Sequence, residues 1–255
     1  MISYLDFAKK LAYKAGDLML KYFKVGVESR VKGDKTLVTL ADEEINQMVI
    51  DEVAKKYPQH SVLGEEASDY KQSEYAWACD PIDGTLPFVK GLPVSVFSLA
   101  LVKDGEPKVG VVYDPFTKRL YSGVEGRGAF LNDLHIRVSN KKLGRQATID
   151  IECLPGTKYD FIVPSHRLSL KTGVYLLQLG SGINACCLVA CGQYEACLFD
   201  GTEGKNVDIA AVKVIVEEAG GKVTDLFGSE QRYDRDIRGA IISNGLVHKD
   251  LVGLV

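Results

Sequence analysis

The hydrophobic period changes along this chain, and the change limits its fold more than any other feature of the sequence. Apolar residues recur at helical spacing behind Ser3-x-x-Asp6 and again behind Thr39-x-x-Asp42, so two N-terminal helices with capping patterns are predicted. A strand-rich middle follows, with Gly, Pro and Asp turns between its segments. The strands predicted there are Tyr75–Cys79, Val94–Lys103, Val109–Tyr113 and Leu120–Ser122.

The C-terminal part alternates between strands and helices. Its predicted elements are strands Tyr159–Val163 and Val174–Leu179, helix Asn184–Cys191, strand Glu195–Phe199, helix Asn206–Ala219 and strand Gly239–Ser243. Gly220-Gly221 is typical of a left-handed stop for the longer helix. Helices, then strands, then alternating units predict a layered α/β fold. We divide it into an N-terminal α+β half, residues 1–140, and a C-terminal α/β half, residues 141–255.

The composition excludes several classes of protein. With 31 basic and 34 acidic residues the net charge is −3, which argues against nucleic acid as a partner. Apolar runs fall short of the ~18 residues that a membrane span needs, and the N-terminus lacks the layout of a signal peptide. The six cysteines show no zinc-ligand spacing and are expected to be reduced. We therefore expect a cytoplasmic globular protein with no membrane partner.

The stretch from Trp77 to Thr85 carries the strongest chemical signal. An apolar strand is followed by Asp80-Pro81-Ile82-Asp83-Gly84-Thr85, which places two carboxylates three residues apart before Gly-Thr. A haloacid-dehalogenase phosphatase needs D-x-D-G-T, with the first Asp as nucleophile. The residue two positions before Asp83 is Pro81, which cannot attack a phosphate, so that chemistry is excluded.

Other acids lie at similar junctions. Glu65 follows an apolar segment, and Asp42 and Asp208 fall in the first turns of predicted helices. Taken one at a time, a capping box would explain Asp42 and the helix dipole would explain Asp208. Their combination with the Asp80–Thr85 segment favours a shared site.

Together these segments resemble the inositol monophosphatase family, part of a superfamily of Mg²⁺-dependent, lithium-sensitive phosphatases that includes fructose-1,6-bisphosphatases. The resemblance runs from about residue 5 to 250. The matching segments are 38–42, 64–66, 80–85, 110–115, 126–132, 208–211, 218–221 and 243–245. The resemblance implies a layered αβαβα sandwich of the sugar-phosphatase type, a homodimer, and two or three Mg²⁺ ions.

The resemblance also implies which residues hold the metal ions. Glu65, Asp80 and the carbonyl of Ile82 would hold the first ion. Asp80, Asp83 and Asp208 would hold the second, and Glu65 would also reach a third. Carboxylates about 4 Å apart repel by ~4 kcal/mol per pair at an effective dielectric near 20, so such a cluster calls for cations. All-oxygen ligands favour Mg²⁺ over zinc.

The remaining site residues are implied in the same way. Thr85 and Asp42 would orient and deprotonate the attacking water, with Glu65 also in the catalytic set. The amides of Gly84 and Thr85 would cradle the phosphate. The substrate-binding set is completed by Ser181, Gly182, Asp200 and Asp208.

The substrate stays open at this point. Inositol monophosphate or a similar small polyol or sugar monophosphate comes first. Fructose-1,6-bisphosphate, of the archaeal and possibly bifunctional type, comes second, and histidinol phosphate third. A 3′-phosphoadenosine 5′-phosphate phosphatase is weakened by Leu86, where those enzymes often have Lys. Two further departures from the family pattern are Val207, where Trp is usual, and Asn46, where Glu is common.

Two interpretations lie outside catalytic phosphatases. Residues 180–185 fit G-x-G-x-x-A, and Asp200 follows about twenty residues on, which is the fingerprint of a dinucleotide-binding oxidoreductase. The other interpretation is a regulatory or scaffold protein that kept the fold and lost turnover.

Overall fold

The computed structural model describes residues 1–24, 26–33, 37–153, 157, 159, 161–199 and 205–254. Its helices are α1 Ile2–Tyr22, α2 Leu40–Lys56, α3 Thr85–Val89, α4 Ile162–Thr172, α5 Gly182–Ala190, α6 Asn206–Glu218 and α7 His248–Val252. Its strands are β1 Ser29–Val31, β2 Leu37–Thr39, β3 Ser61–Gly64, β4 Tyr75–Asp83, β5 Val96–Lys103, β6 Glu106–Asp114, β7 Arg119–Val124, β8 Ala129–Leu131, β9 Leu134–His135, β10 Thr148–Glu152, β11 Tyr175–Leu177, β12 Ala196–Phe199, β13 Lys222–Thr224 and β14 Ala240–Ser243.

A larger and a smaller sheet form the frame of the fold. The larger sheet has the order β3-β4-β5-β6-β7-β8-β9, in which β3 and β4 are parallel and the following neighbours antiparallel. The smaller sheet has the order β11-β10-β12-β14-β13, with β10 parallel to both of its neighbours. Strands β1 and β2 make a separate antiparallel pair.

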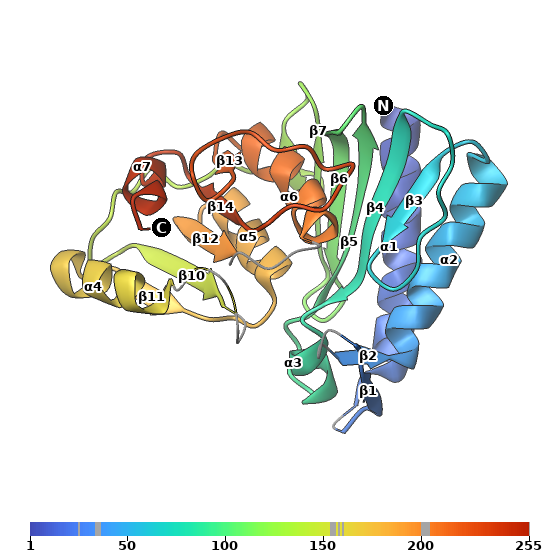
Figure 1. Cartoon of the computed structure of the whole chain (residues 1–255), viewed down its shortest axis with the longest axis horizontal. Coiled ribbons are helices and arrows are strands. Elements are labelled where there is room, and N and C mark those ends of the chain that lie inside the picture. Colours follow the sequence, from blue (N-terminus) through green and yellow to red (C-terminus); the bar gives the residue numbers. More distant parts are fainter. Residues whose placement is uncertain are drawn as a thin grey trace.

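Helices separate and cover the two sheets (Figure 1). Helices α1 and α2 pack on one face of the larger sheet, and α5 and α6 lie between the sheets. Helices α4 and α7 contact the smaller sheet at β11 and β14, on the side away from α5. The layers therefore run α, β, α, β, α, and the predicted sandwich is confirmed.

The larger sheet is apolar on both faces because both faces are covered. Along β5, Leu99 and Leu101 join the core under α1 and α2, whereas Ala100 and Val102 join the core under α6. Two glycines let α6 lie close to the sheet. A Cβ on Gly110 would lie 2.3 Å from the carbonyl oxygen of Ala211, so β6 and α6 are in backbone contact there. A Cβ on Gly123 would lie 2.9 Å from the Cα of Ile215.

Most predicted elements are present, and two details were wrong. Helix α1 begins at Ile2 without a side-chain cap, so the Ser3-x-x-Asp6 pattern does not cap it. The carbonyl of Met1 already accepts the N–H groups of Tyr4 and Leu5, which places Ser3 inside the first turn. The capping box at Thr39 and Asp42 is present at the start of α2.

The predicted strand Tyr159–Val163 was also wrong, because Ile162 and Val163 open helix α4. Both side chains are exposed, so their apolar character does not report a buried strand. Pro164 lies in the first turn of α4, where a helix tolerates the missing N–H. Gly173 ends α4 in the left-handed conformation, with φ of 79°.

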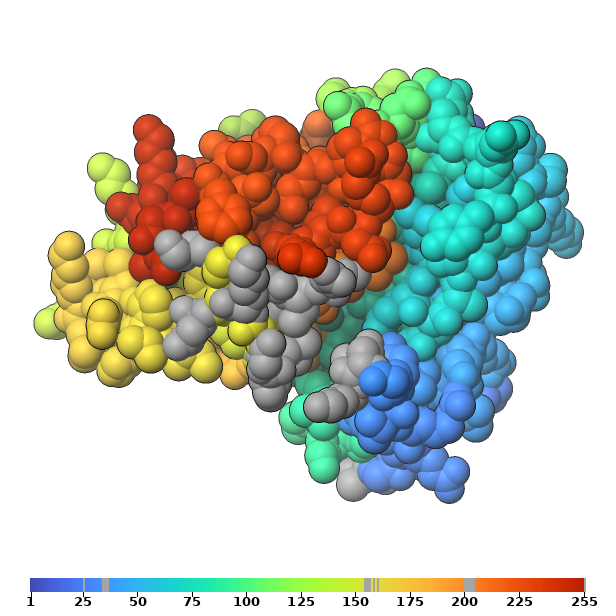
Figure 2. Space-filling view, in the orientation of Figure 1, coloured from blue at the N-terminus to red at the C-terminus, as the bar shows by residue number. Residues whose placement is uncertain are grey.

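The two sheets fall on either side of residue 140. The larger sheet ends at β9 and the smaller begins at β10, yet α6 packs across the strands of the larger sheet. In Figure 2 the orange-red surface of the C-terminal part lies directly against the teal surface of the N-terminal part, and the N–H of Tyr233 donates to the carbonyl of Gly105 at 2.8 Å. The division into halves 1–140 and 141–255 stays a prediction. No helix within the described ranges is long and apolar enough to cross a membrane.

Candidate active site

The carboxyl end of β4 is irregular where the two predicted metal acids lie. Asp80 pairs with Ser98 of β5, but Asp83 pairs with Val96, so β4 carries one extra residue between them. Pro81 has no N–H for the ladder, which fits a bulge. Residues three apart in a regular strand face opposite sides of the sheet. The bulge breaks that alternation and brings Asp80 and Asp83 into electrostatic contact.

Thr85 and Asp42 meet although 43 residues separate them in the chain. The hydroxyl of Thr85 lies 3.4 Å from Oδ1 of Asp42 and 3.2 Å from the carbonyl oxygen of Ile82. The other oxygen of Asp42, Oδ2, accepts hydrogen bonds from the N–H and hydroxyl of Thr39. The capping box therefore anchors one oxygen of Asp42 and leaves the other facing Thr85.

Gly84 joins β4 to α3 in the left-handed region, with φ of 80°. A Cβ at this position would lie 2.9 Å from the carbonyl oxygen of Gly180 and 3.0 Å from the Cβ of Ser181. Both the backbone conformation and the space thus require glycine. The turn before α5 is packed directly against the predicted phosphate cradle.

Asp83 receives hydrogen bonds from that same turn. The Ser181 hydroxyl donates to Oδ2 of Asp83 at 2.5 Å, and the N–H of Ile183 donates to the same oxygen at 2.9 Å. Gly182 opens helix α5 one residue further on and is buried. Asp200, the predicted reader of substrate hydroxyls, lies outside the described residues.

Two lysines bind the remaining predicted acids. Nζ of Lys205 lies 2.7 Å from Oδ2 of Asp208, in the first turn of α6. Nζ of Lys32 lies 2.9 Å from both Glu65 and Glu66. These ammonium groups place positive charge beside a strongly acidic cluster.

The acids perturb one another's pKa values. Burial raises the pKa of Asp80 well above its usual range, and the charges of Glu65, Asp83 and Asp208 raise it further. Burial raises the pKa of Asp83 to about 7, against a lowering effect of the Ser181 hydrogen bond. Burial likewise raises the pKa of Asp42 to about 6. Perturbation of this kind, in several acids at one place, is typical of functional sites.

The donor chemistry of this cluster fits a divalent cation. Within the residues that the structure describes, no three acidic, cysteine or histidine side chains already converge on one point. The carboxylates are instead turned toward ammonium groups and N–H donors, as Asp208 is toward Lys205. Their hard oxygen donors and excess negative charge are nonetheless what Mg²⁺ requires, once the side chains turn inward.

The departures from the family pattern have local explanations. Val207, in the first turn of α6, is buried in the hydrophobic core, which suits an apolar side chain. Asn46 donates to the carbonyl of Ala67 at 2.9 Å and packs against the end of β3. A Cβ on Gly64 would lie 2.2 Å from Oδ1 of Asn46, so this contact needs the glycine that precedes Glu65.

Sequence reasoning missed the roles of Lys32 and Glu66 and left that of Lys205 conditional. The spacing of Lys205, three residues before Asp208 at the start of a predicted helix, could have predicted the ion pair. Lys32 meets Glu65 from 33 residues away, and no local pattern signals such a contact.

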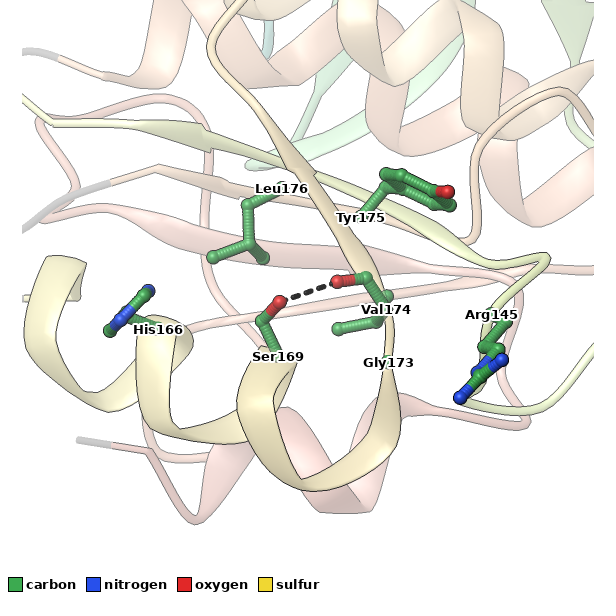
Figure 3. Close-up of a pocket in the computed structure, with 7 residues that line it drawn as sticks. All are labelled: Arg145, His166, Ser169, Gly173, Val174, Tyr175 and Leu176. Atoms are coloured by element: carbon green, nitrogen blue, oxygen red, sulfur yellow. Dashed lines mark hydrogen bonds between the residues drawn. The ribbon is translucent and has the colours of Figure 1, made fainter.

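A cavity of about 490 Å³ lies elsewhere, between α4 and β11 (Figure 3). It is lined by Arg145, His166, Ser169, Gly173, Val174, Tyr175 and Leu176. None of these is a predicted site residue, so this cavity is separate from the carboxylate cluster.

The sandwich of layers and the acidic cluster beside a Thr–Asp pair define a phosphatase class of the sugar-phosphatase type. The sequence matches the inositol monophosphatase family over residues 2–254. A fructose-1,6-bisphosphatase/inositol-1-monophosphatase of Thermotoga maritima is 36% identical over 254 residues, which cover 98% of this chain and 95% of that protein. The Nus factor SuhB of Pasteurella multocida is 34% identical over 232 residues, which cover 88% and 85%.

A solved structure gives the same result. The structure of an IMPase from Thermotoga maritima superposes with a TM-score of 0.87 at 35% identity, covering 99% of this chain and 96% of that one. The chain belongs to the inositol monophosphatase family, as its sequence segments predicted. Members of this family are metal-dependent phosphatases that hydrolyse phosphoric monoesters, and their substrates are phosphorylated sugars or polyols.

The dinucleotide interpretation finds no support in the fold. A dinucleotide-binding βαβ unit joins neighbouring parallel strands. Here β11 and β12, on either side of α5, are separated by β10. The glycine-rich turn between β11 and α5 instead bonds Asp83 through Ser181.

Proposed function

We propose that this protein is a Mg²⁺-dependent phosphomonoesterase that hydrolyses inositol monophosphate or a similar small polyol or sugar monophosphate. The observation that carries the proposal is the meeting of Thr85 and Asp42 beside the mutually repelling acids at the end of β4. The Thr85–Asp42 pair can move a proton, and the mutually repelling acids call for cations.

The proposed metal ligands follow the family pattern. Glu65, Asp80 and the carbonyl of Ile82 would hold one Mg²⁺, and Asp80, Asp83 and Asp208 a second. A third ion at Glu65 completes the proposal of two or three ions. When bound, such ions make water acidic and stabilise negative charge on the attacking and leaving oxygens.

The proton path is built from Thr85 and Asp42. The attacking water would donate to the hydroxyl oxygen of Thr85, whose own proton would pass to Oδ1 of Asp42, 3.4 Å away. The nearer acceptor, the carbonyl of Ile82 at 3.2 Å, is the one proposed to hold a cation. Asp42 cannot turn away, because Thr39 binds its other oxygen. A pKa of about 6, raised by burial, suits a base that works near neutral pH.

The substrate is held by groups on both sides of Asp83. The amides of Gly84 and Thr85 would bind the phosphate. The alcohol part of the substrate would be bound by Ser181, Gly182 and Asp200. Asp208 would contact the substrate between these two parts. A buried acceptor for a hydroxyl discriminates strongly against analogues that lack it. We therefore propose that Asp200 accepts hydrogen bonds from the hydroxyl groups of a polyol substrate.

Fructose-1,6-bisphosphate is the second candidate, and one observation favours it. Lys205 turns inward, with its side chain 22% exposed and its ammonium group at Asp208. Bound Mg²⁺ at Asp208 would free that ammonium group for a second phosphate. The Thermotoga maritima relative carries both activities in its name.

A substrate panel tests this proposal. Phosphate release is measured from inositol 1-phosphate, fructose 1,6-bisphosphate, histidinol phosphate, 3′-phosphoadenosine 5′-phosphate and an aryl phosphate, with Mg²⁺ and with chelator. We expect Mg²⁺-dependent release, fastest from the monophosphate. A clear preference for the bisphosphate would promote the second candidate. No release would favour a regulatory role, and release that persists with chelator would contradict a Mg²⁺-dependent mechanism. Tight NADH binding would favour the oxidoreductase interpretation.

We also propose a cytoplasmic homodimer. Helix α4 and the edge strand β11 expose apolar side chains, including Leu170 and Tyr175, that a second copy could cover. Sedimentation analysis tests this, with Leu170→Lys expected to weaken the dimer. A monomer at micromolar concentration would contradict it.

A further inference from the structure

Two carboxyl groups on β10 contact the turn that leads into α5. Oδ1 of Asp150 accepts the N–H of Leu179 at 2.9 Å, and Oε1 of Glu152 accepts the N–H of Gly180 at 3.1 Å. Asp150 is fully buried, and Glu152 is half-buried. Both acids thus bind consecutive amides of one turn from 28 and 29 residues away.

The end of that turn is hydrogen-bonded to Asp83, a predicted metal ligand. Ser181, the next residue, donates its hydroxyl to Oδ2 of Asp83, and the N–H of Ile183 follows. Both described hydrogen bonds to Asp83 fall on Oδ2, so Oδ1 is the oxygen that we assign to a cation. The orientation of Asp83 depends on where the turn lies.

The turn also touches the predicted phosphate cradle. The carbonyl oxygen of Gly180 lies so close to Gly84 that a Cβ there would be 2.9 Å away. Gly180 is itself left-handed, with φ of 79°, and lies against the ring of Pro87. Glu152 packs on the next glycine, since a Cβ on Gly182 would lie 2.9 Å from its Cγ. A shift of this turn would therefore move both the cradle and Asp83.

A neutral side chain would hold these amides at a smaller electrostatic cost. Burial is the main cause that raises the pKa of Asp150 to about 6 and that of Glu152 to about 8, and the charge of Asp150 contributes to the second value. Two neighbouring carboxyls behind an already acidic site are expensive to bury. Hydrogen bonds to a charged carboxylate are shorter and stronger than hydrogen bonds to a neutral acceptor, which offsets part of that cost.

We propose that Asp150 and Glu152 are positioning residues that hold the 179–181 turn and so fix Asp83 for a divalent cation. This inference rests on the proposed role of Asp83 as a Mg²⁺ ligand. Partners that orient a ligand from behind typically contribute 10–100-fold to metal affinity or activity.

Glu152 allows a matched test. Glu152→Gln keeps an acceptor for the N–H of Gly180 and a donor for Asp150, whereas Glu152→Ala removes both. Both variants replace the ionisable carboxyl group with an uncharged side chain, so their difference isolates positioning from electrostatics. Should the alanine variant fail to fold, Glu152→Leu keeps packing against Gly182 and still lacks the acceptor.

The readouts are the Mg²⁺ dissociation constant by titration calorimetry and the amide hydrogen exchange of Gly180. We expect Glu152→Ala or Glu152→Leu to weaken Mg²⁺ binding about tenfold and to speed exchange at Gly180, with Glu152→Gln within about twofold of wild type. High Mg²⁺ should restore most of the maximal rate to the alanine variant.

Equal Mg²⁺ affinity in all the variants would overturn the positioning role. Equal loss in the glutamine and alanine variants would also overturn it, because charge alone would then explain the effect. If wild type itself binds no Mg²⁺, the proposed function fails instead, so the two failures are distinguishable.

Discussion

Helix α6 carries two charged clusters that differ in their balance. Along the helix, Nζ of Lys213 lies 2.5 Å from Glu217 and 2.7 Å from Glu230, and 3.3 Å from the carbonyl of Val223. Three acceptors therefore meet the three protons of one ammonium group. At its first turn, Asp208 belongs to a group of acids that outnumber their lysine partners.

We interpret the Lys213 cluster as one that stabilises the fold and the acids near Asp80 as a group that serves the proposed function. In the Lys213 cluster the three ammonium protons each have an acceptor, so the positive charge is matched within the fold. The acids near Asp80 raise one another's pKa, which costs stability and is retained only where a cation can offset it. Substitutions in the two clusters should therefore affect different quantities.

The largest effect is expected for Asp83→Asn. The variant keeps the shape and an acceptor for Ser181 but removes a charge that a cation requires, so phosphate release should fall by roughly a thousandfold. The exposed acid in Asp133→Asn is a matched control and should leave the rate unchanged. Full activity of Asp83→Asn at the wild-type Mg²⁺ optimum would break the distinction between the clusters.

Thr85→Ala sharpens the same distinction within the site. It removes the hydroxyl that we propose relays a proton to Asp42, so the maximal rate should fall about a hundredfold or more. Mg²⁺ affinity should stay nearly unchanged, because Thr85 is not a proposed ligand. A variant that mainly loses Mg²⁺ affinity would make Thr85 a ligand or a cap instead. Steady-state kinetics over a range of Mg²⁺ concentrations provide both numbers.

The opposite pattern is expected for Lys213→Ala. Removing a buried ammonium leaves Glu217 and Glu230 facing each other, and since both are partly exposed the cost should be about 1–3 kcal/mol. Urea unfolding measures it, with Lys213→Met as the variant that keeps the packing of the stem. The rate per folded molecule should change by no more than about twofold. A thousandfold loss of rate in Lys213→Ala would contradict the view that this cluster serves stability and not catalysis.

The smallest effect concerns a second balanced cluster. Buried His248 lies 2.9 Å from the hydroxyl of Thr224 and 2.8 Å from that of Ser243, and burial lowers its pKa from 6.5 to about 4. The unfolded chain then binds more protons between these values, so stability falls as the pH falls through that window. The contribution is about 1 kcal/mol between pH 6.5 and about 5.5.

Urea unfolding of wild type and His248→Asn over that range isolates the effect. The variant should lose less stability than wild type as the pH falls. The raised pKa values of Asp83 and Asp42 act in the opposite direction, because the folded state then holds more protons, and they act equally in both proteins. Parallel pH profiles would show that His248 is not titrating as proposed.

Local patterns predicted the parts of the molecule that local physics determines. The capping box of Thr39 and Asp42, the run of β4 into Asp80, and Asp208 in the first turn of α6 are all as expected. Each depends on residues a few positions apart, or on a strand buried on both faces. The predicted strand Tyr159–Val163 failed because a short apolar run does not distinguish a strand from an exposed first turn of a helix.

Long-range contacts could not be predicted in the same way. The bulge at Pro81 was not predicted, although it decides how Asp80 and Asp83 lie relative to each other. The contacts of Lys32 with Glu65 and of Glu152 with Gly180 join segments that only the folded sheet order brings together. The family resemblance predicted which residues would hold the metal ions, whereas the contacts that position those residues depend on the order of strands in the folded sheets.

The most direct test of the account is the effect of Mg²⁺ on thermal unfolding of wild type and Asp208→Asn. Binding to the folded state alone should stabilise wild type by about 3 kcal/mol at a hundredfold excess over the dissociation constant, or roughly 5–10 °C. The gain should be smaller in Asp208→Asn, in which one ligand charge and part of the repulsion are absent. Sodium chloride at matched ionic strength is the control. A melting temperature of wild type that is indifferent to millimolar Mg²⁺ would contradict a cation site at the end of β4.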